Sequence, residues 1–121
     1  MNKKYIIRKN EEIQKIIKKS KKIINKYFII YYSSNSYNYN RYCISVSKKI
    51  GKAHVRNLYK RRIKDILIKN SINFSKDYVI ILRVNILTLT YAQIRDNLMK
   101  ILKGENRWEK KLLLYFWYYY H

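Results

Sequence analysis

The spacing of apolar residues changes several times along the chain, and each change marks a new predicted element. Near the N-terminus, apolar residues recur every three or four positions among lysines, which predicts an amphipathic helix with Asn10 as its N-cap. Glu11 and Glu12 are interpreted as first-turn charges that favour the positive helix end, not as a general acid/base pair. The apolar side of this helix consists of Ile13, Ile16, Ile17 and, at the far end of the pattern, Ile24.

Further along, apolar residues recur at every second position, which predicts β-strands. Residues 27–32 are aromatic and β-branched, and a polar loop over residues 33–40 separates them from an alternating run over residues 41–47. After a turn at residues 75–77, residues 78–84 are apolar enough for a central strand. In the 41–47 strand, Tyr42, Ile44 and Val46 face one side, and Arg41, Cys43, Ser45 and Ser47 face the other. We therefore expect a sheet with one apolar face and one polar, basic face that is free to receive a ligand.

Between these strands, a helix is predicted from about Ala53 to about Asn70, with one apolar and one cationic side. Its apolar stripe is interrupted at Arg62, whose side chain must extend to solvent or pair. Like charges four residues apart repel, so either this side is simply solvated or an anionic partner compensates it. The apolar stripe is Val55, Tyr59, Ile63 and Ile66; the cationic side is Arg56, Lys60 and Lys64, continued by Asn57 and Arg61.

A last helix is predicted after Thr90, because Thr90 and Gln93 fit a capping box at its start. Gly104 fits the position just past its C-terminal end. Its apolar stripe is Ile94, Leu98, Ile101 and Leu102. We divide the chain into a domain over residues 1–108 and an apolar, aromatic tail over residues 109–121, which either packs back or associates with another surface.

Composition narrows the function. The 121 residues carry a formal net charge of +21, which is typical of proteins that bind polyanions. Lys, Asn, Ile and Tyr have A/T-rich codons, so the eight arginines are more informative than the lysines. The single cysteine cannot form an internal disulfide, and two histidines offer no zinc cluster. We expect no secretory leader and no membrane span.

The segment over residues 45–66, SVSKKIGKAHVRNLYKRRIKDI, carries the most specific signal. It resembles the signature of the bacterial ribonuclease P protein subunit, in which a serine, a lysine, a glycine and an alanine precede an Arg-Asn-Arg and a Lys-Arg pair. Leu58 departs from it, because the family has a second arginine there. The matching positions are Ser47, Lys49, Gly51, Ala53, Arg56, Asn57, Lys60 and Arg61.

The resemblance covers about residues 6 to 106 and implies an α+β fold. The implied order is α-β-β-β-α-β-α, a two-layer sandwich in which helices pack on a small sheet. The sequence itself predicts three strands. The fourth strand and a left-handed βαβ crossover, which runs against the usual handedness, follow from the resemblance alone.

The resemblance also implies a function: the protein subunit of ribonuclease P, which assists removal of the 5′ leader from precursor tRNA in the cytoplasm. The chemistry and its Mg²⁺ are implied to belong to the RNA subunit, so we expect no catalytic residue, metal ligand or cofactor in the protein. In agreement, the sequence shows no nucleophile–base pair and no carboxylate cluster for two metals. The implied partners are ribonuclease P RNA and precursor tRNA, without a membrane or a small-molecule substrate.

Two binding surfaces are implied. Contact with the RNA subunit is assigned to Lys49, Arg56, Asn57, Lys60, Arg61 and Lys64. A cleft for the leader is assigned to Ile13, Ile17, Tyr31, Arg41 and Lys48. Many relatives carry phenylalanine at the positions of Ile13 and Ile17, and isoleucine cannot stack on bases, so these two residues are either cleft or ordinary core.

Two other classes of function remain open on the sequence alone. One is another basic structural RNA-binding protein, such as a ribosomal protein. The other is a membrane-surface protein with basic amphipathic helices, which the strand pattern opposes.

Overall fold

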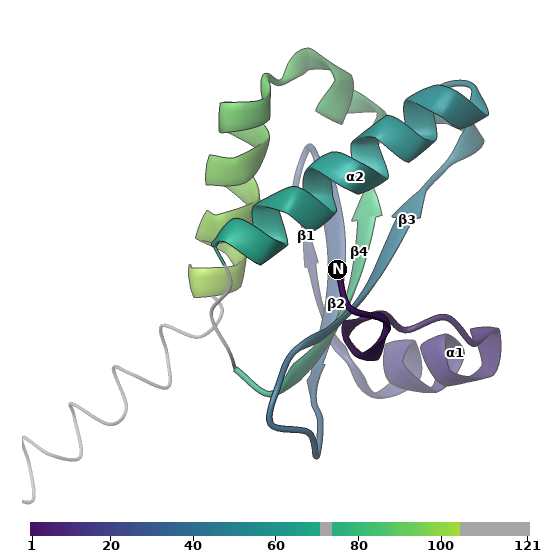
Figure 1. The fold of residues 1–121 in the computed structure, drawn as a ribbon, viewed down its shortest axis with the longest axis vertical. Helices are drawn as coiled ribbons and strands as arrows, with labels where there is room; N and C mark the ends of the chain where they lie inside the picture. The colour runs from purple at the N-terminus through teal and green to yellow at the C-terminus, as the bar shows by residue number, and fades with distance from the viewer. Residues whose placement is uncertain (71–73, 105–121) are drawn as a thin grey trace, which may run out of the picture.

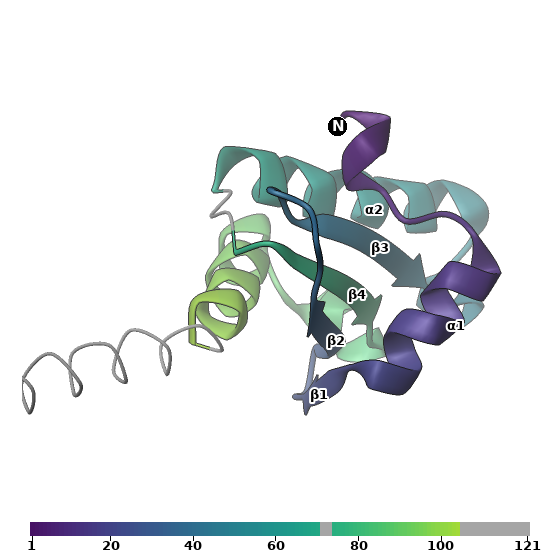
Figure 2. The same ribbon diagram turned by 90° about the horizontal axis from the view of Figure 1, so that it is seen from below.

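The computed structural model describes residues 1–70 and 74–104. It contains a four-stranded sheet in the order β1-β2-β4-β3, with helices on both of its faces (Figures 1 and 2). The α+β class and the element order are as predicted, and the fourth strand is present. The elements are α1 (Asn10–Lys19), β1 (Lys21–Ile24), β2 (Phe28–Ser34), β3 (Arg41–Val46), α2 (Ala53–Lys69), β4 (Lys76–Leu82), a helix over residues 91–104, and the 3-10 turns η1 (Lys3–Tyr5), η2 (Lys48–Ile50) and η3 (Val84–Thr88).

β4 is the centre of the sheet. It pairs antiparallel with β2 and parallel with β3, and α2 connects β3 to β4. Tyr78, Ile80 and Leu82 of β4 are buried on the side of α2, whereas Val79 is buried on the side of α1. This burial on both faces explains why the segment has a nearly continuous apolar sequence.

The main core lies between the sheet and two helices, α2 and the helix over residues 91–104. The predicted stripe of α2 is confirmed, because Tyr59, Ile63 and Ile66 are buried and Val55 packs against them. The capping box is also confirmed: the Thr90 N–H donates to Gln93 Oε1 at 2.9 Å, and the Gln93 N–H donates to Thr90 Oγ1 at 3.3 Å.

The opposite face of the sheet differs from the prediction of a wholly polar face. α1 lies across part of it (Figure 2), and a small apolar cluster fills the contact. Its buried members are Ile7, Ile16 and Val79, with Ile13, Ile17, Tyr31, Cys43 and Ile81 packed around them.

Several predicted boundaries were wrong. Lys9, not Asn10, is the N-cap of α1, and its carbonyl accepts the N–H of Ile13. The helix ends at Lys19, because the next residues pair with β2 as the edge strand β1. Lys76 and Asp77 belong to β4 and not to a turn.

Differences also occur toward the C-terminus. β4 ends at Leu82, and Val84 begins η3. Gly104 is still helical. The end of that helix and the predicted tail lie outside the described residues.

Candidate nucleic-acid interface

The turn before α2 requires a glycine. Gly51 has φ +155°, and a Cβ atom added there would lie 3.2 Å from Cβ and Cγ1 of Val55. A larger residue would therefore be strained and crowded against the first turn of α2. Gly51 thus allows Lys48 and Lys49 of η2 to sit directly beside the start of the helix.

The cationic side of α2 is partly exposed, and none of its members is fully buried. Asn57, Arg61 and the preceding Lys49 are exposed, whereas Arg56, Lys60 and Lys64 are half-buried. Nε of Arg56 is buried without a hydrogen-bond partner in the described part of the chain. Packing thus holds the stem of Arg56 in place, although no internal acceptor binds its Nε.

Among residues 1–70 and 74–104, acidic side chains do not neutralise this side of α2. Of the five acidic residues in the described ranges, Glu12 and Asp77 bind Arg41, Asp65 binds Lys69, and Asp96 binds Arg95. The fifth, Glu11, lies in the first turn of α1. Within residues 1–70 and 74–104, none of the five predicted cations (Lys49, Arg56, Lys60, Arg61 and Lys64) has an ion-pair partner.

Arg62 lies in the apolar stripe, as predicted, and its guanidinium finds an aromatic partner. Cζ lies 5.1 Å from the ring centroid of Tyr59. Leu58 is 36% exposed, which supports its position at the edge of the stripe and not in the core.

The predicted leader cleft is only partly assembled as expected. Ile13, Ile17 and Tyr31 meet in the apolar cluster under α1, where each is half-buried. Arg41 and Lys48 lie at opposite ends of β3, roughly 20 Å apart at the rise of a strand. The five residues therefore mark a strip along the sheet and not a compact pocket.

Arg41 has structural partners that the sequence did not reveal. Its Nε and Nη2 donate to the two carboxylate oxygens of Asp77, each at 2.9 Å, and its Nη1 donates to Glu12 at 2.7 Å. These hydrogen bonds raise the pKa of Arg41 further above its ordinary value, against the effect of burial. Arg41 thus connects α1 to β4, in addition to any contact with a ligand.

The two predicted surfaces approach each other at the free edge of β3. Burial raises the pKa of the Cys43 thiol, and the positive charge of Lys60 opposes that shift. Cys43 faces α1 and Lys60 extends from α2, so the cationic side of α2 reaches the same edge as the strip.

Sequence reasoning missed a group of aromatic residues beside the strip. Tyr37 and Tyr39 belong to the loop between β2 and β3, and their ring centroids lie 5.3 Å apart. The ring of Tyr39 also lies 5.2 Å from that of Tyr5 in η1. The repeated Tyr-Asn pattern at residues 37–40 was a signal for this group, although the loop was interpreted only as polar.

Within the described residues, no helix is long and apolar enough to cross a membrane. Nor do residues 1–70 and 74–104 contain a group of three or more His, Cys, Asp or Glu side chains that could hold a metal ion.

Comparisons with known proteins agree on one family. The family model described as Ribonuclease P matches residues 1–105. The ribonuclease P protein component of Mycoplasma mycoides is 48% identical over 107 residues, which cover 85% of this chain and 97% of the relative. The RNase P protein of Staphylococcus aureus has a similar structure, with a TM-score of 0.76 and 36% identity over 84% of this chain and 94% of that chain. The RNase P protein of Thermotoga maritima has a TM-score of 0.75 and 30% identity, over 81% of this chain and 94% of that chain.

Proposed function

The chain belongs to the ribonuclease P protein component family, and from this premise we propose that it binds the catalytic RNA subunit and the 5′ leader of precursor tRNA. In this role it assists the endonucleolytic removal of the leader, in the cytoplasm where precursor tRNAs are processed. Neither alternative class, a ribosomal protein or a membrane-surface protein, gains support from the family or from the packed sheet.

The observation that carries the proposal is the cationic side of α2, whose charges have no internal counter-ion in the described ranges. Five cations without an ion-pair partner among the described residues repel one another until an anion binds. RNA phosphates are regularly spaced anions, and their binding releases counter-ions, which adds favourable free energy. Lys49, Arg56, Lys60, Arg61 and Lys64 therefore form the proposed contact with the RNA subunit, and Asn57 supplies a donor and an acceptor for base or sugar edges.

The strip on the opposite face is the proposed path of the leader. Single-stranded RNA is recognised by aromatic rings that stack on bases and by cations that bind its backbone. Tyr31 supplies such a ring between α1 and the sheet, and Lys48 supplies an exposed cation at one end. Ile13 and Ile17 contribute an apolar wall and, at the same time, pack against the cluster under α1.

We assign the chemistry of cleavage to the RNA subunit and its Mg²⁺. The described part of the chain offers binding groups in abundance, but no three-residue metal cluster of its own. The contribution of the protein is therefore to hold both RNAs together, to neutralise phosphate repulsion between them, and so to reduce the magnesium concentration that cleavage requires.

Reconstitution tests this proposal. Purified protein is added to a bacterial ribonuclease P RNA at a magnesium concentration too low for the RNA alone, and cleavage of precursor tRNA is followed. We expect the protein to restore cleavage at the mature 5′ end. An equally basic protein of another fold serves as the control for general charge neutralisation. Failure to exceed that control would contradict the proposed function.

A further inference from the structure

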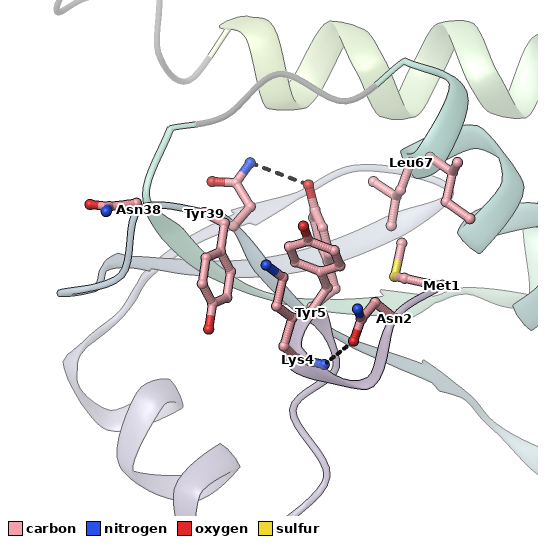
Figure 3. A pocket seen from close by; sticks show the side chains of 10 residues that line it. Met1, Asn2, Lys4, Tyr5, Asn38, Tyr39 and Leu67 are labelled. Carbon is pink, nitrogen blue, oxygen red and sulfur yellow. Dashed lines mark hydrogen bonds between the residues drawn. The ribbon is translucent and has the colours of Figure 1, made fainter.

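A cavity of about 640 Å³ lies beside the N-terminus (Figure 3). Residues from η1, the β2–β3 loop, β3 and the end of α2 enclose it, so it is built from four separate parts of the chain. Its size suits a ligand of a nucleotide's dimensions. The lining residues are Met1, Asn2, Lys4, Tyr5, Asn38, Tyr39, Asn40, Tyr42, Leu67 and Ile68.

The lining has aromatic rings, amides and a cation, and no acidic side chain is among its described residues. Tyr5 and Tyr39 meet edge to face, with an interplanar angle of 86°. The ammonium of Lys4 lies between them, 4.9 Å from each ring centroid (Figure 3). At the back of the cavity, Asn40 donates to the hydroxyl of Tyr42, so this wall is a fixed polar surface.

The cavity is connected to Arg41 by a chain of close contacts. The guanidinium of Arg41 lies 4.5 Å from the ring of Tyr37, Tyr37 lies beside Tyr39, and Tyr39 beside Tyr5. Arg41 is also the end of the proposed leader strip. Three successive rings with a cation at each end, Arg41 and Lys4, therefore continue past the strip and into the cavity, in a pattern that suits a single strand of RNA.

We propose that this cavity binds an unpaired nucleobase of single-stranded RNA, stacked on Tyr39 or Tyr5. The inference rests on the proposed function, and continuity with Arg41 favours the leader as the source of the base. Such a leader would enter the strip at Lys48, beside the signature helix, and leave it at Arg41.

Lys4 does not block this site. Lys4 is exposed and the two rings are only half-buried, and contact of a solvated cation with a ring is weaker than the stacking of a base. An entering base displaces the ammonium from the rings, and the ammonium is then free to bind the adjacent phosphate. The exchange replaces a weak internal contact with a stacked base and an ion pair.

The test uses the assembled holoenzyme and a series of precursor tRNAs whose leaders are lengthened one nucleotide at a time. We expect Tyr39→Leu and Tyr5→Leu to weaken binding of long-leader substrates by about tenfold. Leaders too short to pass Arg41 should bind as they do to the wild type. Tyr39→Phe keeps the ring and should behave as the wild type, and circular dichroism confirms that each variant is folded.

The arms separate the possible results. A loss only with long leaders supports the leader as the source. A loss in affinity for the RNA subunit alone, measured without substrate, supports the same pocket with a base of that RNA as its ligand. Unchanged affinity of both folded leucine variants in every arm would overturn the pocket. The proposed function itself fails separately, if the wild-type holoenzyme does not prefer precursor over mature tRNA.

Discussion

Arg41 and Asp77 face each other across the parallel pair β3–β4, and two hydrogen bonds of 2.9 Å join the guanidinium to both carboxylate oxygens. The Asp77 side chain is 2% exposed and that of Arg41 is 13% exposed. The Asn35 amide also donates to Asp77, and Glu12 binds the remaining side of Arg41. This group fixes the β2–β3 loop, α1 and the central strand relative to one another.

Arg41→Ala should therefore destabilise the fold as well as affect the leader strip. It leaves a buried carboxylate without its cation, and such a loss costs about 3–5 kcal/mol. The measurement is the free energy of unfolding in denaturant. Arg41→Met combined with Asp77→Leu removes both charges and should recover much of that loss. An Arg41→Ala variant as stable as the wild type would contradict this structural role.

The same double variant separates the two roles of Arg41. If Arg41 also contacts the leader, the double variant regains stability but binds precursor tRNA more weakly than the wild type. If its role is only structural, stability and affinity return together.

Arg56→Ala combined with Arg61→Ala should weaken binding to the RNA subunit and reduce its salt dependence. Each lost phosphate contact lowers the slope of log affinity against log salt by about 0.7–0.9. The fold should persist, because Arg61 is exposed and Arg56, which is half-buried, belongs to neither apolar cluster. Lys100→Ala with Lys103→Ala is the matched control, since it removes the same charge from exposed positions on the helix over residues 91–104. Equal losses in the two double variants would indicate a general charge effect.

Tyr31→Ala should weaken the binding of precursor tRNA more than the binding of mature tRNA, because only the precursor has a leader. Loss of a stacked base corresponds to about 1–3 kcal/mol. Tyr31 also packs in the cluster under α1. Tyr31→Phe, which retains that packing and the ring, should bind both substrates normally. The measurement is the affinity of the holoenzyme for each tRNA. Equal losses of affinity for the two tRNAs would exclude Tyr31 as a leader contact.

Leu58→Arg should tighten RNA binding. Leu58 is 36% exposed beside the cationic side of α2, so an arginine can lay its stem on the apolar surface and extend its guanidinium to a phosphate. The salt dependence should steepen by about one unit, and the melting temperature should change little. Leu58→Gln controls for loss of the apolar side chain. A large decrease in melting temperature without a gain in affinity would show that Leu58 supports the core.

The contact between α2 and the helix over residues 91–104 should depend on pH. The Tyr91 hydroxyl donates to Asp65, and this hydrogen bond, followed by that of Lys69, lowers the pKa of the Asp65 carboxyl. Because the pKa of Asp65 is lower in the folded state, its carboxylate stabilises the fold at pH values above the pKa of the unfolded chain, about 3.9. This stabilisation is lost as the pH falls through the pKa of the folded state. Tyr91→Phe should therefore lose less stability than the wild type on acidification. Thermal melts of both proteins between neutral pH and acidic pH provide the measurement, and parallel curves would contradict the prediction.

The sequence by itself determined three helices, three of the four strands and the two sides of α2. These features depend on local periodicity, because a buried stripe repeats every three or four residues wherever a helix packs on a sheet. The capping box at Thr90 is local in the same sense. The signature around Arg56 and Asn57 indicated the family through residue types and their spacing alone.

Tertiary structure alone decided what the polar residues contact. β1 was missed because Lys21–Ile24 is an edge strand whose pairing depends on β2 and not on its own pattern. The partners of Arg41 lie 29 and 36 residues away, and a charge pattern along the chain cannot show which carboxylate folds back onto which guanidinium. For the same reason Tyr5 and Tyr39, which belong to separate segments of the sequence, became walls of one cavity only once the chain had folded.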